Sequence, residues 1–314
     1  MPPLLSLLFL TRLYFFLLTL IIICCSLIES LRKINKVYGK LEDTISHKTW
    51  LTSKLSVPKY YFRYFYITGF LWISYIIIEI ILFKNNFIGI FSIFVHLFEN
   101  TNNEEIYKEY YGKQPVEECI LALFMMEVQT LRRAYECFFV EKPSPNSKML
   151  ITHHIVGMTF YLATGLAVFI EGLWNLGVFN KDQFTSLPPL TNFIKWNTMI
   201  ALSLFIYASY HQNVLHNHLA SLRPSNTSNT SYVPIYLIPK GDWFEYISSA
   251  HYFAEILIYV SFVILTRGMN LTVWLVLIWT IIGLGTIARE SDLWGKEKFG
   301  EKWPNRWLII PFIY

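Results

Sequence analysis

The chain has 314 residues, of which 54% are hydrophobic and 15% charged, and its mean hydropathy is positive at +0.39. This balance excludes an ordinary soluble domain, and with a formal net charge of only +4 we expect no nucleic acid among its partners. Because a bilayer core of roughly 30 Å needs about 20 apolar residues per helix, transmembrane helices can be located as apolar runs of that length.

Seven such runs follow one another along the chain. They predict an all-α polytopic membrane protein, in which about seven transmembrane helices enclose a cavity for cofactor and substrate and residues 1–314 form one integral membrane domain. The runs are Leu4–Ile28, Phe62–Phe83, Val116–Val140, Ile151–Gly172, Phe193–Tyr210, Tyr246–Thr266 and Leu271–Ala288.

Two segments of the N-terminal third could be read in more than one way. The first apolar run lacks the basic start and the small-residue cleavage site of a signal peptide, so we expect a retained helix. The run Phe87–Phe98 is about half as long as a span and carries His96, which indicates an interfacial or re-entrant segment.

The distribution of basic residues predicts the orientation. Lysine and arginine are concentrated in the first, third and fifth loops and in the C-terminal tail, and such residues accumulate on the cytosolic side of membrane proteins. We therefore expect a lumenal N-terminus and a cytosolic C-terminus.

The third run ends with the polar sequence EVQTLRRAYECFFV. Arg132 and Glu136 are four residues apart, a spacing that allows an ion pair on one helix face. Arg133 points to another side and, if it faces inward, suits an anionic ligand. The alternative is that these arginines snorkel to the membrane interface.

The sixth run, GDWFEYISSAHYFAEILIYV, begins with Gly-Asp, which predicts a turn followed by a helix-capping residue. Within it His251 and Glu255 are four residues apart and share one helix face. Two interpretations stay open for this polar stripe, which either packs two helices together or faces a cavity.

The sequence YHQNVLHNHLASLRP follows the fifth run. Gln212, His216 and Arg223 are spaced so that a continuing helix would align them on one face, and their amide, imidazole and guanidinium groups suit a phosphorylated ligand. The histidines also raise the possibility of a membrane di-iron site. Such sites use HxxxH and HxxHH boxes, neither of which occurs here, so we expect no metal.

Four stretches, QTLRRAYECFFV, HQNVLHNHLASLR, IPKGDWFEYISSAHYFAEILIYVSF and KFGEKWPNRWLIIPFIY, together resemble the steroid 5α-reductase family, and its polyprenol (polyprenal) reductase branch in particular. They lie in residues 116–314, which form the reductase-like part of the chain. The resemblance implies a seven-helix enzyme of the endoplasmic reticulum membrane that uses NADPH to saturate a carbon–carbon double bond.

The resemblance also implies which residues bind the cofactor. The family's nucleotide-binding Asn/Asp/Arg ladder falls on Gln212, His216 and Arg223, with only the arginine kept. An asparagine of the sixth helix falls on His251, and the glutamate one turn later is kept. The implied set is Arg133, Gln212, His216, Arg223, Tyr236, His251 and Glu255.

Three positions depart from the pattern of the steroid reductases. The arginine that follows the tyrosine of the IP motif is Leu237 here, the tyrosine that meets the steroid ketone falls near Thr130, and a tyrosine of the tail falls at Trp294 or Gly295. These departures argue against a steroid substrate.

The chemistry favours an unsaturated aldehyde as the substrate. Hydride added to an isolated alkene leaves an unstabilised carbanion, whereas an α,β-unsaturated carbonyl accepts the charge as an enolate. We therefore expect polyprenal, a long polyisoprenoid lipid, rather than polyprenol. The candidates for the acid or oxyanion donor are Glu127, Tyr135 and Glu136, all in the third run.

Two other functional classes fit parts of the sequence. One is a membrane methyltransferase of the isoprenylcysteine type, because the segment ARE at 288–290 is similar to that family's Arg/Glu-rich motif. The other is a non-catalytic scaffold in which the polar stripe only joins helices.

Overall fold

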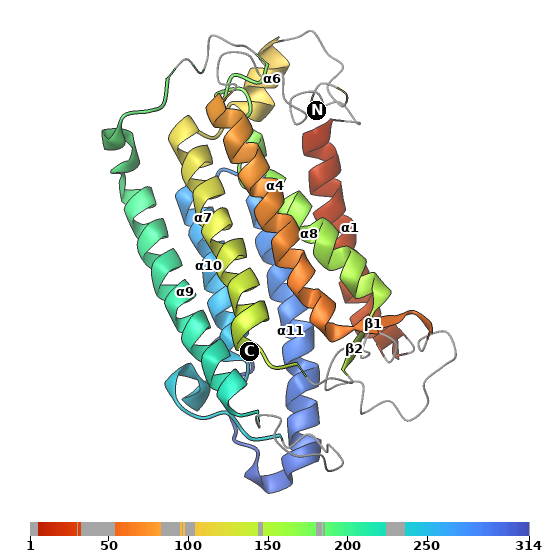
Figure 1. The fold of residues 1–314 in the computed structure, drawn as a ribbon. Helices are drawn as coiled ribbons and strands as arrows, with labels where there is room; N and C mark the ends of the chain where they lie inside the picture. Colours follow the sequence, from red (N-terminus) through yellow and green to blue (C-terminus); the bar gives the residue numbers. More distant parts are fainter. Residues whose placement is uncertain are drawn as a thin grey trace.

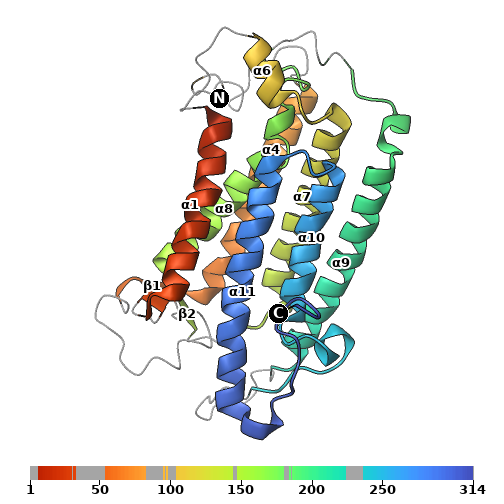
Figure 2. The same ribbon diagram turned by 180° about the vertical axis from the view of Figure 1, so that it is seen from behind.

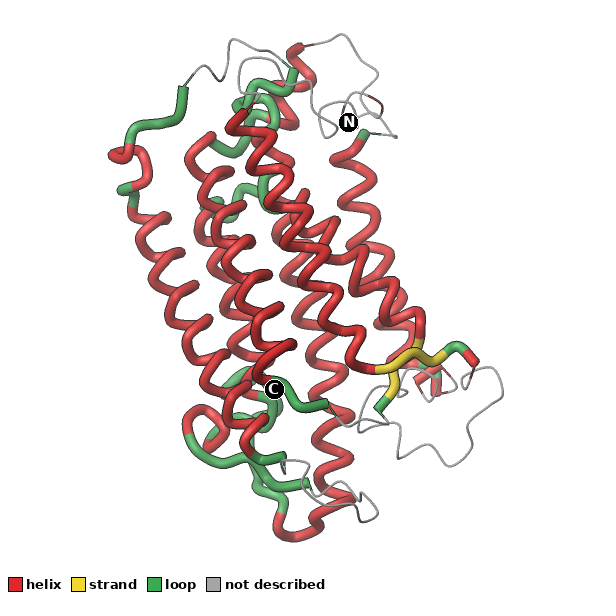
Figure 3. Tube along the Cα trace, in the orientation of Figure 1, coloured by secondary structure: helices red, strands yellow, loops and turns green. Residues whose placement is uncertain are grey.

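The computed structural model describes residues 6–29, 31–32, 54–82, 95, 97, 104–143, 147–179, 184, 186–223 and 236–313. Figures 1 and 3 show long helices side by side in one bundle, with a single short sheet at one end. The all-α membrane fold expected from the sequence is confirmed.

Eight α-helices make up the bundle and its caps in the described part of the chain. They are α1 (Leu7–Leu27), α4 (Arg63–Leu82), α6 (Glu104–Tyr111), α7 (Val116–Tyr135), α8 (Ile151–Ala167), α9 (Trp196–Ser221), α10 (Ala250–Leu265) and α11 (Leu271–Phe299).

Short elements connect these helices. Strands β1 (Ser56–Pro58) and β2 (Lys148–Leu150) pair antiparallel, with Val57 opposite Met149. The short helices are η2 (Lys59–Phe62), η3 (Glu136–Val140), η4 (Ile170–Gly172), η6 (Leu190–Phe193), η7 (Asp242–Glu245) and η8 (Gly300–Lys302), of which η3 is a π-helical turn that continues α7.

Four helical segments are long and apolar enough to cross a membrane, namely Leu7–Leu27, Lys59–Leu82, Ile151–Gly172 and Leu271–Lys302, and α10 is a shorter apolar helix. Helices α7 and α9 have sufficient length but carry more polar residues. The count of seven spans therefore stays a prediction. The half-length run Phe87–Phe98 falls almost wholly outside the described residues.

Some helix boundaries differ from the apolar runs. Helices α9 and α11 extend 11 residues beyond the ends expected at Tyr210 and Ala288, because polar residues continue the helices past the apolar part. Helix α10 begins only at Ala250, so the expected cap at Asp242 is wrong. Gly241 and Asp242 have positive φ angles of 86° and 46°, and this turn leads into η7 instead.

Apolar side chains and small residues pack the helices together. Buried Leu, Ile, Phe and Met side chains of all the long helices form one core. Helix α8 approaches α4 closely at Gly157, where an added Cβ would lie 2.3 Å from the Phe65 ring.

The C-terminal segment pairs with the chain just before α10. The amide of Ser248 donates to the Trp307 carbonyl at 2.8 Å, and the amide of Ser249 donates to the Leu308 carbonyl at 3.0 Å. Figures 1 and 2 show that this segment lies toward the end of the bundle opposite to the start of α1.

Helix α1 is held to the bundle by a buried ion pair. Arg12 lies 3.0 Å from the carboxylate of Glu171, which is fully buried, and the same oxygen accepts hydrogen bonds from the amide and hydroxyl groups of Thr272 at 3.0 and 2.8 Å. The contact joins three elements, α1, η4 and α11.

Replacement of Arg12 by methionine is expected to lower the free energy of unfolding by roughly 3 kcal/mol, because the buried Glu171 carboxylate would lose its counter-charge. Denaturant unfolding of the purified protein in detergent measures this change. Lys195→Met is the control, because Lys195 pairs with Glu117 through a side chain that is 43% exposed, and such pairs contribute at most about 1 kcal/mol. Equal losses in both variants would contradict the role of Arg12.

Candidate functional site

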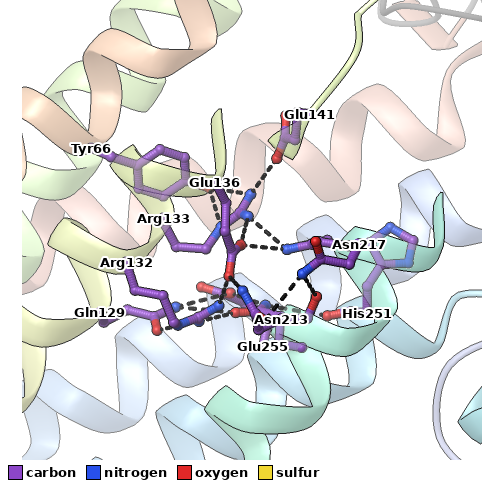
Figure 4. A network of polar contacts seen from close by, with 12 residues as sticks. Tyr66, Gln129, Arg132, Arg133, Glu136, Glu141, Asn213, Asn217, His251 and Glu255 are labelled. Atoms are coloured by element: carbon purple, nitrogen blue, oxygen red, sulfur yellow. Dashed lines mark hydrogen bonds and ion pairs between the residues drawn. The ribbon is translucent and has the colours of Figure 1, made fainter. Parts of the chain in front are cut away.

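A network of charged and amide side chains lies at the end of the bundle where α7 and α9 end and α10 begins (Figure 4). The basic-residue distribution predicts that this end faces the cytosol. Its members come from five segments that are far apart in the sequence, namely α4, α7 with η3, the residue after η3, α9 and α10.

Arg133 is the centre of the network and is 4% exposed. Its guanidinium donates to the Tyr66 hydroxyl through Nε and Nη2 at 3.3 and 3.2 Å, and Nη2 also donates to Glu141 at 3.0 Å. Nη1 is paired with Glu136 and lies 2.7 Å from Nδ1 of His216. Arg133 therefore faces inward and does not snorkel.

Glu136 is fully buried and collects four partners. Arg132 pairs with it as the four-residue spacing predicts, and Asn213 donates to the same oxygen at 2.8 Å. Arg133 and Nδ1 of His216 contact the other oxygen, the latter at 2.7 Å. Since one ring nitrogen cannot accept from Arg133 and donate to Glu136 at once, the tautomer of His216 selects one of these bonds.

A second layer lies next to this one and joins α7, α9 and α10. Gln212 donates to Glu255 at 2.5 Å and to the backbone carbonyl of His251 at 3.3 Å. Gln129 donates to the same Glu255 oxygen at 3.2 Å, and Arg132 donates to Gln129 at 2.7 Å. The His251 ring lies 5.7 Å from that of His216. The polar stripe of α10 therefore lies against polar side chains of α7 and α9.

Glu141 closes the network just beyond the end of η3. Burial would raise the pKa of its carboxyl, but the charge of Arg133 and the hydrogen bond that Arg133 donates outweigh this effect and hold the pKa below its usual value. Glu141 is therefore an anion next to the Arg133 guanidinium.

Two of the catalytic candidates lie apart from these layers. Glu127 pairs with the Ser74 hydroxyl on α4, two turns of α7 deeper into the bundle than Arg133. Tyr135 is 56% exposed and packs its ring against Phe139 on the outer face of α7. Only Glu136 of the three belongs to the network.

Two residues that were expected to bind the cofactor, Arg223 and Tyr236, lie outside both layers of the network. Helix α9 ends at Ser221, so Arg223 is not aligned with Gln212 and His216 on one helix face, and its guanidinium donates to the Lys142 carbonyl at 2.5 Å. The ring of Tyr236 packs against that of Trp294 at 4.8 Å.

Sequence reasoning did not assign Tyr66, Gln129, Asn213 and Glu141. Gln129 could have been found, because it precedes Arg132 and Arg133 by about one helical turn. Tyr66 lies on α4, and no local pattern links that helix to α7.

The remaining histidines of α9 stabilise the neighbouring turn. His211 stacks on Trp243 at 4.5 Å and contacts the Asp242 carboxylate at 3.1 Å, and His218 accepts a hydrogen bond from the amide of Lys240 at 3.4 Å. Both imidazoles therefore have partners within the protein.

Comparisons with known proteins match this chain to one family. The family model described as 3-oxo-5-alpha-steroid 4-dehydrogenase matches residues 147–314, which is more than half of the chain. The chain is 28% identical to a polyprenal reductase of Ailuropoda melanoleuca over 92% of its own length and 87% of that protein. It is also 28% identical to polyprenal reductase 1 of Oryza sativa subsp. indica, with 83% and 80% covered, and to a polyprenal reductase of Xenopus tropicalis, with 92% and 89% covered.

Proposed function

The chain belongs to the 3-oxo-5-alpha-steroid 4-dehydrogenase family, and on this basis we propose that it is an NADPH-dependent oxidoreductase that acts on a carbon–carbon double bond. Its substrate is polyprenal, whose α-isoprene double bond it saturates in dolichol synthesis for protein N-glycosylation. The observation that carries this proposal is the alignment with polyprenal reductases of animals and plants over more than four-fifths of the chain.

The polar network fits a nicotinamide dinucleotide. Guanidinium groups suit phosphates, and Arg133 would bind one by exchanging a carboxylate partner for a phosphate oxygen, whereas Arg223 would release the Lys142 carbonyl. The Gln212–Glu255 pair offers both a donor and an acceptor to a polar ring substituent. Arg133, Gln212, His216, Arg223, Tyr236, His251 and Glu255 would hold the cofactor, which supplies the hydride when bound.

The position of the network supports the proposed topology. It lies at the end of the bundle that carries the basic loops, so the water-soluble cofactor would reach it from the cytosol while the lipid substrate stays in the endoplasmic reticulum membrane. The N-terminus is then lumenal and the C-terminus cytosolic.

The contacts of Glu136 favour a positioning role over proton donation. Its two oxygens are shared among Arg132, Arg133, Asn213 and His216, so the carboxylate is held as an anion that orients these donors. Of the sequence candidates for an acid or oxyanion donor, Glu127 and Tyr135 have no such cation beside them among the described residues and are kept as proposals.

The proposed function is tested with the purified protein in detergent micelles, supplied with NADPH and either polyprenal or polyprenol. We expect saturation of the aldehyde and none of the alcohol, because only the aldehyde can accept the charge as an enolate. Mass spectrometry of the extracted lipid measures the gain of two hydrogens.

Each other outcome would count against a specific part of the proposal. Saturation of polyprenol alone would overturn the enolate argument. Reaction of neither lipid, together with binding of S-adenosylmethionine, would favour the methyltransferase. Reaction of neither lipid without any nucleotide binding would favour the scaffold.

A further inference from the structure

Tyr259 places a phenol in the core of the bundle without a hydrogen-bond partner for its hydroxyl among the described residues. The side chain is 2% exposed and packs between Phe160 of α8 and Phe262 of α10, at 6.3 and 6.2 Å between ring centroids. Leaving a buried hydroxyl unpaired costs about 1–3 kcal/mol, so native proteins usually pair such groups.

Two other hydroxyls, on α10 and at its C-terminal end, do have partners. Those of Ser261 and Thr266 donate to backbone carbonyls one turn earlier, at 2.5 and 3.0 Å. The two neighbouring phenols are also engaged, because Tyr66 accepts from Arg133 and Tyr161 is hydrogen-bonded to Tyr66. Tyr259 differs from these groups because its hydroxyl has no hydrogen-bond partner among the described residues, a state that it shares with the buried hydroxyls of Thr164 on α8 and Ser209 on α9.

The position of Tyr259 relates it to the polar network. It follows Glu255 by four residues on α10, so it lies on the same face of the helix and one turn deeper in the bundle. It is within electrostatic range of both Glu255 and Tyr66. A substrate head that approaches from the membrane interior toward the network would meet this phenol.

We propose that the Tyr259 hydroxyl is the oxyanion donor of the reaction and binds the aldehyde oxygen of the substrate. The inference rests on the proposed reduction of polyprenal and adds the residue that the sequence did not identify. In this assignment Tyr259 touches the substrate, whereas Glu136 acts only through its neighbours.

When bound, the reduced nicotinamide would supply the hydride for the new C–H bond at the β-carbon and would be oxidised by it. The electron pair of the Cα=Cβ bond would then move to form Cα=C1, and the carbonyl pair would move to the oxygen. The Tyr259 O–H stabilises this enolate oxygen by a hydrogen bond and keeps its proton. A proton from water then adds to the α-carbon, which restores the carbonyl and leaves the saturated aldehyde and oxidised nicotinamide.

The test replaces only the phenol oxygen, by Tyr259→Phe. We expect kcat for polyprenal to fall by about 10²–10³-fold, the effect of losing one oxyanion donor, with unchanged NADPH affinity. The thermal unfolding temperature should stay equal or rise, because an unpaired buried hydroxyl is removed. The infrared carbonyl stretch of bound polyprenal should shift to lower frequency in the wild type and lose this shift in the variant.

Tyr161→Phe is the matched control, because its hydroxyl is bonded within the protein. We expect it to melt at a lower temperature and to keep kcat within a few-fold. If the wild type and Tyr259→Phe reduce polyprenal equally fast, Tyr259 is not the oxyanion donor, while the proposed function still stands. If Glu127→Gln then loses activity, the donor is Glu127. Absence of wild-type activity on polyprenal would instead overturn the proposed function.

Discussion

Replacement of Arg133 by methionine is expected to abolish NADPH binding and to lower the free energy of unfolding by about 3–5 kcal/mol. Methionine fills a similar space but removes the donors to Tyr66, Glu136 and Glu141 together. Arg132 can still pair with Glu136, whereas the guanidinium bond to Glu141 is lost. Fluorescence titration with NADPH and denaturant unfolding measure the two effects separately.

Two further variants sharpen this test. Arg63→Met removes an arginine that, in the described part of the chain, donates to the Tyr60 carbonyl and lies over the Tyr60 and Phe138 rings. We therefore expect a loss below about 1 kcal/mol and intact binding. Arg133→Lys keeps the charge but not the planar fork of donors, and we expect it not to restore binding. Normal NADPH affinity in Arg133→Met would show that the site is elsewhere.

Replacement of Glu255 by leucine should weaken NADPH binding by about 10–100-fold, the effect of losing a charged hydrogen-bond acceptor worth roughly 1.5–3 kcal/mol. Glu255 is the shared acceptor of Gln212 and Gln129, so its loss frees two amides that no longer hold a fixed orientation. The dissociation constant for NADPH, measured by fluorescence, reports this loss directly.

The stability of this variant should change little or increase, because leucine is less costly than a carboxylate inside a membrane protein. Asn217→Ala serves as the control on α9, since its side chain is exposed and bonds only to Asn213. If Glu255→Leu binds NADPH as the wild type does, Glu255 is a helix-packing residue and the scaffold interpretation gains support.

Helical periodicity predicted two pairs of the polar network because it acts within one element. It placed Arg132 with Glu136 and His251 with Glu255 on shared helix faces. It was not applied to Tyr135 and Glu136, which are both donor candidates although their side chains lie about 100° apart around the helix. The same rule failed at Arg223, because α9 ends two residues earlier and the spacing no longer describes a helix face.

Contacts between elements could not be derived in this way. Tyr66 reaches Arg133 across 67 residues of sequence, and Asn213 reaches Glu136 across 77. These contacts depend on how α4 and α9 are rotated about their axes relative to α7. That rotation is set by the packing of apolar side chains and small residues along the whole length of the helices. A single sequence contains no local signal for it.

The backbone pairing of the C-terminal segment with the residues before α10 has a consequence for biogenesis. The carbonyls of Trp307 and Leu308 that receive the Ser248 and Ser249 amides are made after every helix of the bundle has been translated. All helices of the bundle can therefore be synthesised while the backbone pairing next to His251 and Glu255 is still missing. A chain truncated shortly before Trp307 would contain every helix of the bundle but would lack this backbone pairing next to His251 and Glu255.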